Sequence, residues 1–180
     1  CRIGSNGTGA MATYDNVLDL IGNTPVVRIT QLDTGPCELY AKLESHNPGG
    51  SIKDRIGLVM IEQAEKRGDL KPGDTIVEAT SGNTGYSLAM VCALKGYHCV
   101  LTVSSKASKE KLALLRSLGA EVAGYALDPP STPSNFAACQ LAEQVTHTVG
   151  DVRDYEKLSA AINEFQPDMI FHLAAQALVR

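Results

Sequence analysis

Apolar and polar positions follow one another along the chain at two alternating spacings. Short β-branched, apolar runs bounded by turn residues predict strands, and longer stretches with apolar residues at helical spacing predict helices. The predicted strands cover 25–29, 37–43, 75–79, 99–103, 121–127, 146–149 and 169–173, and the predicted helices cover 51–67, 86–94, 108–118, 136–145 and 155–165. Strands that alternate with helices imply a parallel sheet with helices on its faces. The pattern therefore predicts an α/β fold of three layers with a mostly parallel, Rossmann-like sheet.

Glycine and proline mark the ends of these elements. Gly68 directly follows the predicted helix 51–67, after basic residues in its last turn, which is a common way for a helix to end. The segment 128–135 contains three prolines and must be a loop, because proline lacks an N–H donor and restricts the residue before it. This segment is the one candidate linker in the sequence.

The length of 180 residues favours one compact unit. Residues 1–10 are small and polar without hydrophobic periodicity, so we expect a disordered leader or a remnant of cloning. We expect the segments 11–120 and 121–180 to pack together into one α/β unit.

Composition narrows the classes of function. A net charge of −4 gives no electrostatic case for a nucleic-acid partner. No apolar run approaches the roughly 20 residues of a membrane span, and no secretory sequence opens the chain, so we predict a cytoplasmic protein with a small-molecule partner. The five cysteines include no C-x-x-C pair and the four histidines no pair at helical spacing, so the sequence predicts reduced thiols and no metal site.

A glycine-rich turn at 47–51 precedes the predicted helix and places Lys53 in its first turn. A positive charge gains nothing from the positive end of a helix dipole, so a lysine there needs another reason. Desolvation would favour its neutral, nucleophilic form and suit it to form an imine with an aldehyde cofactor. The alternative is an exposed lysine that neutralises Asp54 or Glu44.

A second loop, 80–85, follows the predicted strand 75–79 and leads into the next helix. Its hydroxyls, its amide and the free N–H groups of a helix N-terminus are suited to bind an anion. An ordinary strand-to-helix turn, capped by Ser81 or Asn83, is the alternative.

These two loops and the run 20–25 resemble, in order and spacing, the cysteine synthase and cystathionine β-synthase family, over about residues 14–121. Such enzymes use pyridoxal phosphate (PLP) to eliminate or replace a group at the β-carbon of an amino acid. The resemblance implies that Lys53 forms the Schiff base with PLP and shuttles the proton, and that Asn83 hydrogen-bonds the ring hydroxyl. It also implies that the carboxylate of an amino-acid substrate is bound by Thr80, Ser81, Gly82 and Thr84. The family's later segments, which bind the cofactor phosphate and the pyridine nitrogen, have no counterpart in this sequence, so we expect impaired turnover.

Residues of about 117–180 closely resemble a second family, the CDP-glucose 4,6-dehydratases, which are extended short-chain dehydrogenases. This resemblance lies in 118–130, 150–154 and 171–176. It implies NAD as an alternative cofactor. Asp128 would lie near the adenosine ribose of NAD and Asp151 near its adenine, and Ala174, Ala175 and Gln176 would lie along the cofactor.

Each of these residues has a structural alternative. Asp128 begins a proline turn, Asp151 and Asp154 are placed to cap the next helix, and the alanines suit strand packing. The dehydratase family's G-x-x-G-x-x-G turn and Tyr-x-x-x-Lys pair are absent from the sequence.

The two resemblances overlap at 115–122, where both families have a helix that enters a strand, so the sequence predicts a hybrid. Three hypotheses stay open: a PLP-dependent enzyme, an NAD- or nucleotide-sugar-binding segment, and an inactive folded hybrid. Exposed sheet edges in such a chain would favour a homo-oligomer.

Overall fold

A central sheet organises the structure, a computed structural model that describes residues 13–80, 82–103, 108–126, 146–151 and 153–171. The strands run parallel in the order β6-β5-β4-β3-β7. Their bounds are β3 Thr75–Ala79, β4 His98–Thr102, β5 Glu121–Ala126, β6 Thr146–Val149 and β7 Met169–Phe171. Each predicted strand from 75–79 onward is therefore present, within one or two residues at most of its ends.

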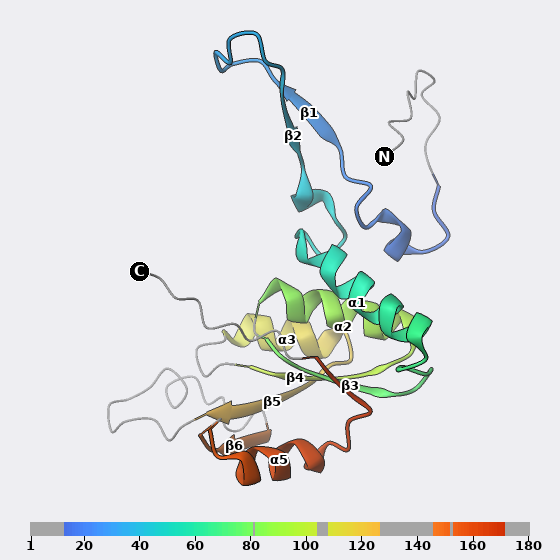
Figure 1. The fold of residues 1–180 in the computed structure, drawn as a ribbon, viewed down its shortest axis with the longest axis vertical. Coiled ribbons are helices and arrows are strands. Elements are labelled where there is room, and N and C mark those ends of the chain that lie inside the picture. Colours follow the sequence, from blue (N-terminus) through green and yellow to red (C-terminus); the bar gives the residue numbers. More distant parts are fainter. Residues whose placement is uncertain (1–12, 81, 104–107, 127–145, 152, 172–180) are drawn as a thin grey trace, which may run out of the picture.

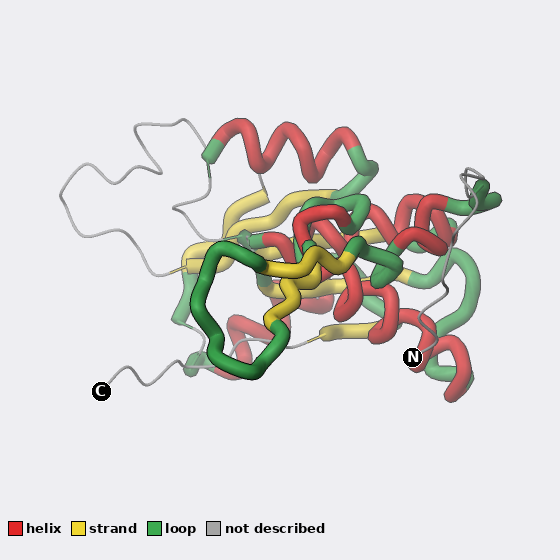
Figure 2. Tube along the Cα trace, turned by 90° about the horizontal axis from the view of Figure 1, so that it is seen from above, coloured by secondary structure: helices red, strands yellow, loops and turns green. Residues whose placement is uncertain are grey.

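Helices cover both faces of this sheet (Figures 1 and 2). One face carries α1 (Lys53–Arg67), α2 (Asn83–Lys95) and α3 (Lys109–Ser117), and the other carries α5 (Tyr155–Glu164). The larger core lies under the first three helices, where Ile61, Leu88 and Leu101 are fully buried. A smaller cluster of Val77, Val100 and Ala123 faces α5 and packs against Phe165. The predicted three-layer α/β fold is confirmed.

Glycine ends α1 and α2, and at Gly68 this confirms the prediction from the sequence. Gly68 takes the left-handed conformation, with φ 76°, and its N–H donates to the carbonyls of Ala64 and Glu65. Gly96 ends α2 in the same way, with φ 79°. Only glycine adopts this conformation without steric cost, so these positions fix where each helix stops.

β7, the last described strand, lies at the edge of the sheet beside β3, which is the first strand of this sheet in the sequence. β7 pairs with β3 in parallel, with Ile76 opposite Met169. The Asp168 carboxylate accepts the Thr75 N–H at 2.8 Å, and the Asp168 N–H donates to the Thr75 carbonyl at 3.1 Å. The C-terminal part of the described chain is thus joined to the N-terminal part by backbone pairing. The expected leader 1–10 and the predicted helix 136–145 lie outside the described residues.

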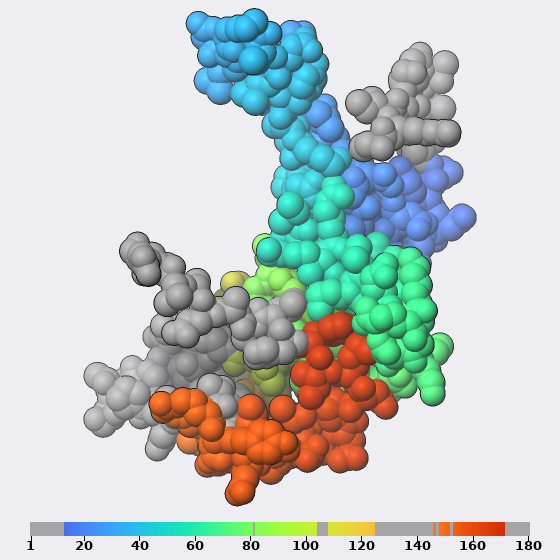
Figure 3. All heavy atoms as spheres, viewed as in Figure 1, coloured from blue at the N-terminus to red at the C-terminus, as the bar shows by residue number. Residues whose placement is uncertain are grey.

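The two strands ahead of α1 form a hairpin separate from the sheet. β1 (Val26–Ile29) and β2 (Leu39–Lys42) pair antiparallel, and the hairpin projects from the body of the molecule (Figures 1 and 3). Val26 is 58% exposed and Tyr40 52% exposed, so the hairpin's apolar side chains are not part of the core. Short 3-10 helices, η1 (Val17–Leu20) and η2 (Glu44–His46), flank it. Within the described ranges, no helix is both long enough and apolar enough to cross a membrane.

Candidate functional site

The turn before α1 is fixed by a buried asparagine. The N–H of Gly50 donates to the Asn47 carbonyl at 2.8 Å, and Gly50 has φ 73°, which favours glycine. Asn47 is only 3% exposed, and its Oδ1 accepts the Gly22 N–H at 2.8 Å while its Nδ2 donates to the Glu44 carbonyl at 2.8 Å. The predicted glycine-rich turn is therefore tied to the base of the hairpin.

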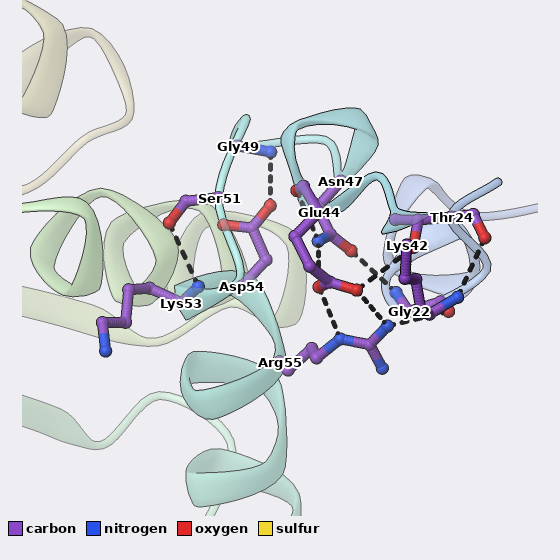
Figure 4. A network of polar contacts seen from close by, with 10 residues as sticks. All are labelled: Gly22, Thr24, Lys42, Glu44, Asn47, Gly49, Ser51, Lys53, Asp54 and Arg55. Carbon is purple, nitrogen blue, oxygen red and sulfur yellow. Dashed lines mark hydrogen bonds and ion pairs between the residues drawn. The ribbon is translucent and has the colours of Figure 1, made fainter. Parts of the chain in front are cut away.

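Arg55 strengthens the same connection (Figure 4). Its Nε donates to Glu44 Oε2 at 2.7 Å, and its Nη2 donates to Glu44 Oε1 at 2.8 Å and to the Gly22 carbonyl at 3.0 Å. Hydrogen bonds from Arg55, against a smaller effect of burial, lower the pKa of Glu44 to about 2. Paired hydrogen bonds of this kind are stronger and more directional than a simple ion pair.

Lys53 lies on the other side of the start of α1. Its side chain points away from Glu44 and Arg55 in Figure 4 and is exposed. The expectation of a desolvated amine is therefore wrong for this structure. The alternative role, neutralising an acidic neighbour, is not seen either, because Glu44 pairs with Arg55 and Asp54 accepts a backbone N–H from Gly49.

A single hydroxyl joins the two predicted loops. Ser51 Oγ accepts the backbone N–H of Lys53 at 3.2 Å and the side-chain Nδ2 of Asn83 at 3.2 Å. The Ser51 hydroxyl thus links the start of α1, which carries Lys53, to the start of α2. Sequence reasoning placed Lys53 and Asn83 in one site but gave Ser51 no role; its position between the glycines and Lys53 was the available signal.

The N-terminus of α2 has no side-chain cap. Gly82 is the N-cap residue, and the Asn83 side chain reaches Ser51 instead of the backbone of its own helix. The alternative of a turn capped by Asn83 is therefore wrong, and Ser81 lies outside the described residues. Free N–H groups at such a helix start attract negative charge.

The topology also points to this loop. The strand order reverses at β3, whose neighbours are β4 on one side and β7 on the other. Ligands in open parallel sheets bind at the carboxyl ends of strands where the order reverses. Thr80, which is half-buried, directly follows the end of β3, and the half-buried Thr84 begins α2 with Asn83.

A hollow of about 420 Å³ opens beside the two loops. Its wall combines parts of both loops with residues of α2 and α3, namely Pro48, Gly49, Gly50, Gly82, Asn83, Tyr86, Lys111, Leu114 and Leu115. The wall is mixed, with an amide and an ammonium group among apolar side chains. The place where the loops meet is therefore open to a small molecule.

The residues proposed for NAD are only partly described. Asp151 is half-buried, and Arg153 Nε donates to both of its carboxylate oxygens at 3.0 Å, which lowers the pKa of Asp151 to about 2. Asp154 caps α5, since its carboxylate accepts the Lys157 N–H at 3.1 Å. Asp128, Ala174, Ala175 and Gln176 lie outside the described residues. The residues that are described contain no cluster suited to a metal ion.

Comparison with known proteins identifies relatives of the chain. A family model described as "Pyridoxal-phosphate dependent enzyme" matches residues 17–170. A cysteine synthase of Staphylococcus aureus (strain Mu50) is 54% identical over 114 residues, which are 63% of this chain and 37% of that protein. The cystathionine β-synthase of Mus musculus is 56% identical over 110 residues, which are 59% of this chain and 20% of that protein.

Solved structures resemble the chain more extensively. A hydrogen sulfide-producing enzyme from Fusobacterium nucleatum superposes with a TM-score of 0.65 at 38% identity, covering 90% of this chain and 46% of that one. O-ureido-L-serine synthase superposes with a TM-score of 0.58 at 41% identity, covering 76% of this chain and 44% of that one. The chain thus spans less than half the length of each of these relatives.

Proposed function

We propose that this chain, which belongs to the family of pyridoxal-phosphate-dependent enzymes, captures PLP through Lys53 and binds an amino acid at the loop 80–84. The observation that carries this proposal is the Ser51 hydroxyl, which links the backbone of Lys53 to the Asn83 side chain. The exposed primary amine of Lys53 on α1, together with an amide donor at an uncapped helix N-terminus that borders a hollow, suits an aldehyde cofactor that carries a hydroxyl and negative charge.

Each group of the site has a distinct task in this proposal. The Lys53 amine attaches the cofactor and later moves a proton at the substrate. The Asn83 amide hydrogen-bonds the ring hydroxyl, and the Thr80 and Thr84 hydroxyls, with Ser81, Gly82 and the N–H groups of α2, bind the substrate carboxylate. When bound, PLP supplies the electron sink for β-elimination and β-replacement.

The reaction proposed is β-replacement or β-elimination on an amino acid, as in cysteine synthase. The matched residues cover 37% of the length of the Staphylococcus aureus relative, so activity of the whole enzyme is part of the proposal. Exposure of Lys53 favours weak turnover, because an exposed site excludes little water and holds the reacting groups loosely.

The resemblance of residues 117–180 to CDP-glucose 4,6-dehydratases stays a prediction, and so does the hybrid that it implies. The contacts of Asp151 with Arg153 do not favour NAD over the structural alternative. PLP is therefore the cofactor that we propose.

Lys53→Ala tests the capture of PLP. With excess PLP, the unaltered chain should develop the near-ultraviolet and visible absorbance of an imine, and borohydride reduction should fix one pyridoxyl group on the peptide that contains Lys53. The variant should show neither change, because the proposal assigns the attack on PLP to the Lys53 amine and not to Lys111, which lines the same hollow as Asn83.

Lys66→Ala is the matched control, since Lys66 lies in the last turn of the same helix. It should keep both the absorbance and the labelled peptide. Equal absorbance in the Lys53 variant, or label spread over many lysines, would reject the proposal.

We also propose that the chain self-associates. Val26, Val27, Leu39 and Tyr40 of the hairpin are all exposed, and a two-stranded hairpin is only marginally stable alone in water. Light scattering should give a mass of at least a dimer; a monodisperse monomer at micromolar concentration would contradict this proposal.

A further inference from the structure

Asp54 is a fully buried carboxylate that follows Lys53 directly in the sequence. It is 0% exposed and lies in the first turn of α1. Its Oδ2 accepts the Gly49 N–H at 2.6 Å, whereas its Oδ1 is buried with no hydrogen-bond partner among the described residues. Burial raises the pKa of Asp54, and the hydrogen bond from Gly49 only partly opposes this. A buried, half-satisfied carboxylate costs stability, so packing alone does not account for it.

Gly49 leaves the space that this carboxylate needs. A Cβ at Gly49 would lie 2.9 Å from Asp54 Cγ, closer than real Cβ contacts allow. Gly49 is not among the glycines with positive φ, so its conformation does not require glycine. Gly50 is the opposite case, with φ 73° and open space around it. The lack of a side chain at Gly49 is therefore what allows the Asp54 carboxylate to approach the turn.

We propose that Asp54 is a positioning residue that holds the turn 47–51 against α1 and so places Lys53 beside Asn83. The inference deepens the proposed function and rests on it. Figure 4 shows the carboxylate of Asp54 directed at Gly49, while the Lys53 side chain leaves the helix in another direction. Asp54 therefore acts through the turn: it holds Gly49, the turn orients Ser51, and Ser51 receives the Lys53 N–H and the Asn83 amide.

Asp54→Ala and Asp54→Asn separate positioning from bulk stability. Without the acceptor, the turn loses its hold on α1, and the rate of imine formation with PLP should fall about tenfold or more, as expected for a misplaced reacting group. Asparagine keeps an oxygen that accepts the Gly49 N–H, so that variant should react within about threefold of the unaltered chain. Ile61→Val is the control, because Ile61 is fully buried in the same helix and distant in sequence from the turn.

Gly49→Ala disturbs the same contact from the side of the turn and leaves the sequence of α1 unchanged. It therefore tests the proposal even if Asp54→Ala does not fold. Its Cβ displaces the carboxylate, so the imine should form about tenfold more slowly. The double variant Gly49→Ala/Asp54→Ala should be no slower than Asp54→Ala, because the overlap is gone. Hydrogen exchange of the Gly49 and Lys53 amides, measured without PLP, should be faster in Asp54→Ala and unchanged in Ile61→Val.

The outcomes are distinguishable. If the unaltered chain forms no Lys53-dependent imine, the proposed function fails and the inference fails with it. If it forms the imine, and Asp54→Ala and Gly49→Ala form it as fast, only the positioning role is wrong. An equal loss of rate in Ile61→Val, at matched thermal stability, would also overturn that role.

Discussion

Glu44 and Arg55 act together at the scale of single residues. Arg55 is two positions after Lys53 on α1, and Glu44 belongs to η2 at the base of the hairpin. Their paired hydrogen bonds, with the bond from Arg55 to the Gly22 carbonyl, fix the direction in which α1 leaves the turn. Arg55 and Lys53 therefore divide the work at the helix start: one side chain anchors it and the other stays available.

Acid should weaken this anchor in a defined range of pH. The pKa of Glu44 is about 2 in the folded chain and near its ordinary value of 4.5 in the unfolded chain. A lowered folded-state pKa gives stability that is present above the unfolded value and is lost as pH falls toward the folded value. The unaltered chain should therefore be more stable than Glu44→Gln at pH 6, and the difference should shrink between about pH 5 and pH 2.

Thermal unfolding of both proteins across this range measures the effect. Asp69→Asn is a suitable control, because Asp69 forms an exposed ion pair with Arg67 at the far end of the same helix. A difference between the Glu44 variant and the unaltered chain that stays constant down to pH 2 would show that the ion pair does not set the effect.

At the scale of elements, the sequence predicted whatever depends on local pattern. The strand 75–79 has the predicted bounds, and α1 ends at its predicted glycine, because β-branched runs and left-handed glycines act within a few residues. The apolar pattern predicts that α2 starts at Tyr86, whereas the helix starts at Asn83. No side-chain cap marks this helix start, so local sequence carried no signal for it.

Long-range contacts were beyond sequence reasoning. The sequence presents Asp54 only as a charge beside Lys53, whereas the folded chain buries it against Gly49. The desolvation expected of Lys53 depends on neighbours distant in the chain, and the amine is exposed. Pairing of the strands at 26–29 and 39–42 into an antiparallel hairpin likewise depends on which partner each strand meets.

At the scale of the whole molecule, one sheet joins segments from both ends of the described chain. β3 lies between β4 and β7. One edge of β3 therefore pairs with the next strand in the sequence, and the other edge pairs with the last described strand. Among the residues that the structure describes, three helices lie over the larger core and one helix, α5, lies over Val77, Val100 and Ala123. A substitution on this second face therefore tests whether the sheet unfolds as one cooperative unit.

Phe165→Ala should destabilise the molecule as a unit. Phe165 follows α5 and packs on the second face, so its loss should lower the free energy of unfolding by about 1–3 kcal/mol, less than for a fully buried phenylalanine. Because β7 is paired with β3, urea unfolding followed by circular dichroism should keep one transition at a lower midpoint. Tyr155→Ala, at a side chain 79% exposed on the same helix, should change the midpoint little.

Hydrogen exchange then decides whether the chain is one cooperative unit. In Phe165→Ala the amides of β3 and β7 should lose protection together, because parallel pairing transmits the opening of one strand to the other. Faster exchange confined to α5 and β7, with β3 and β4 unchanged, would mean that the C-terminal part opens alone. The second face would then be a loosely attached layer, and the capture of PLP, which depends on the loop after β3, should be unaffected by the substitution.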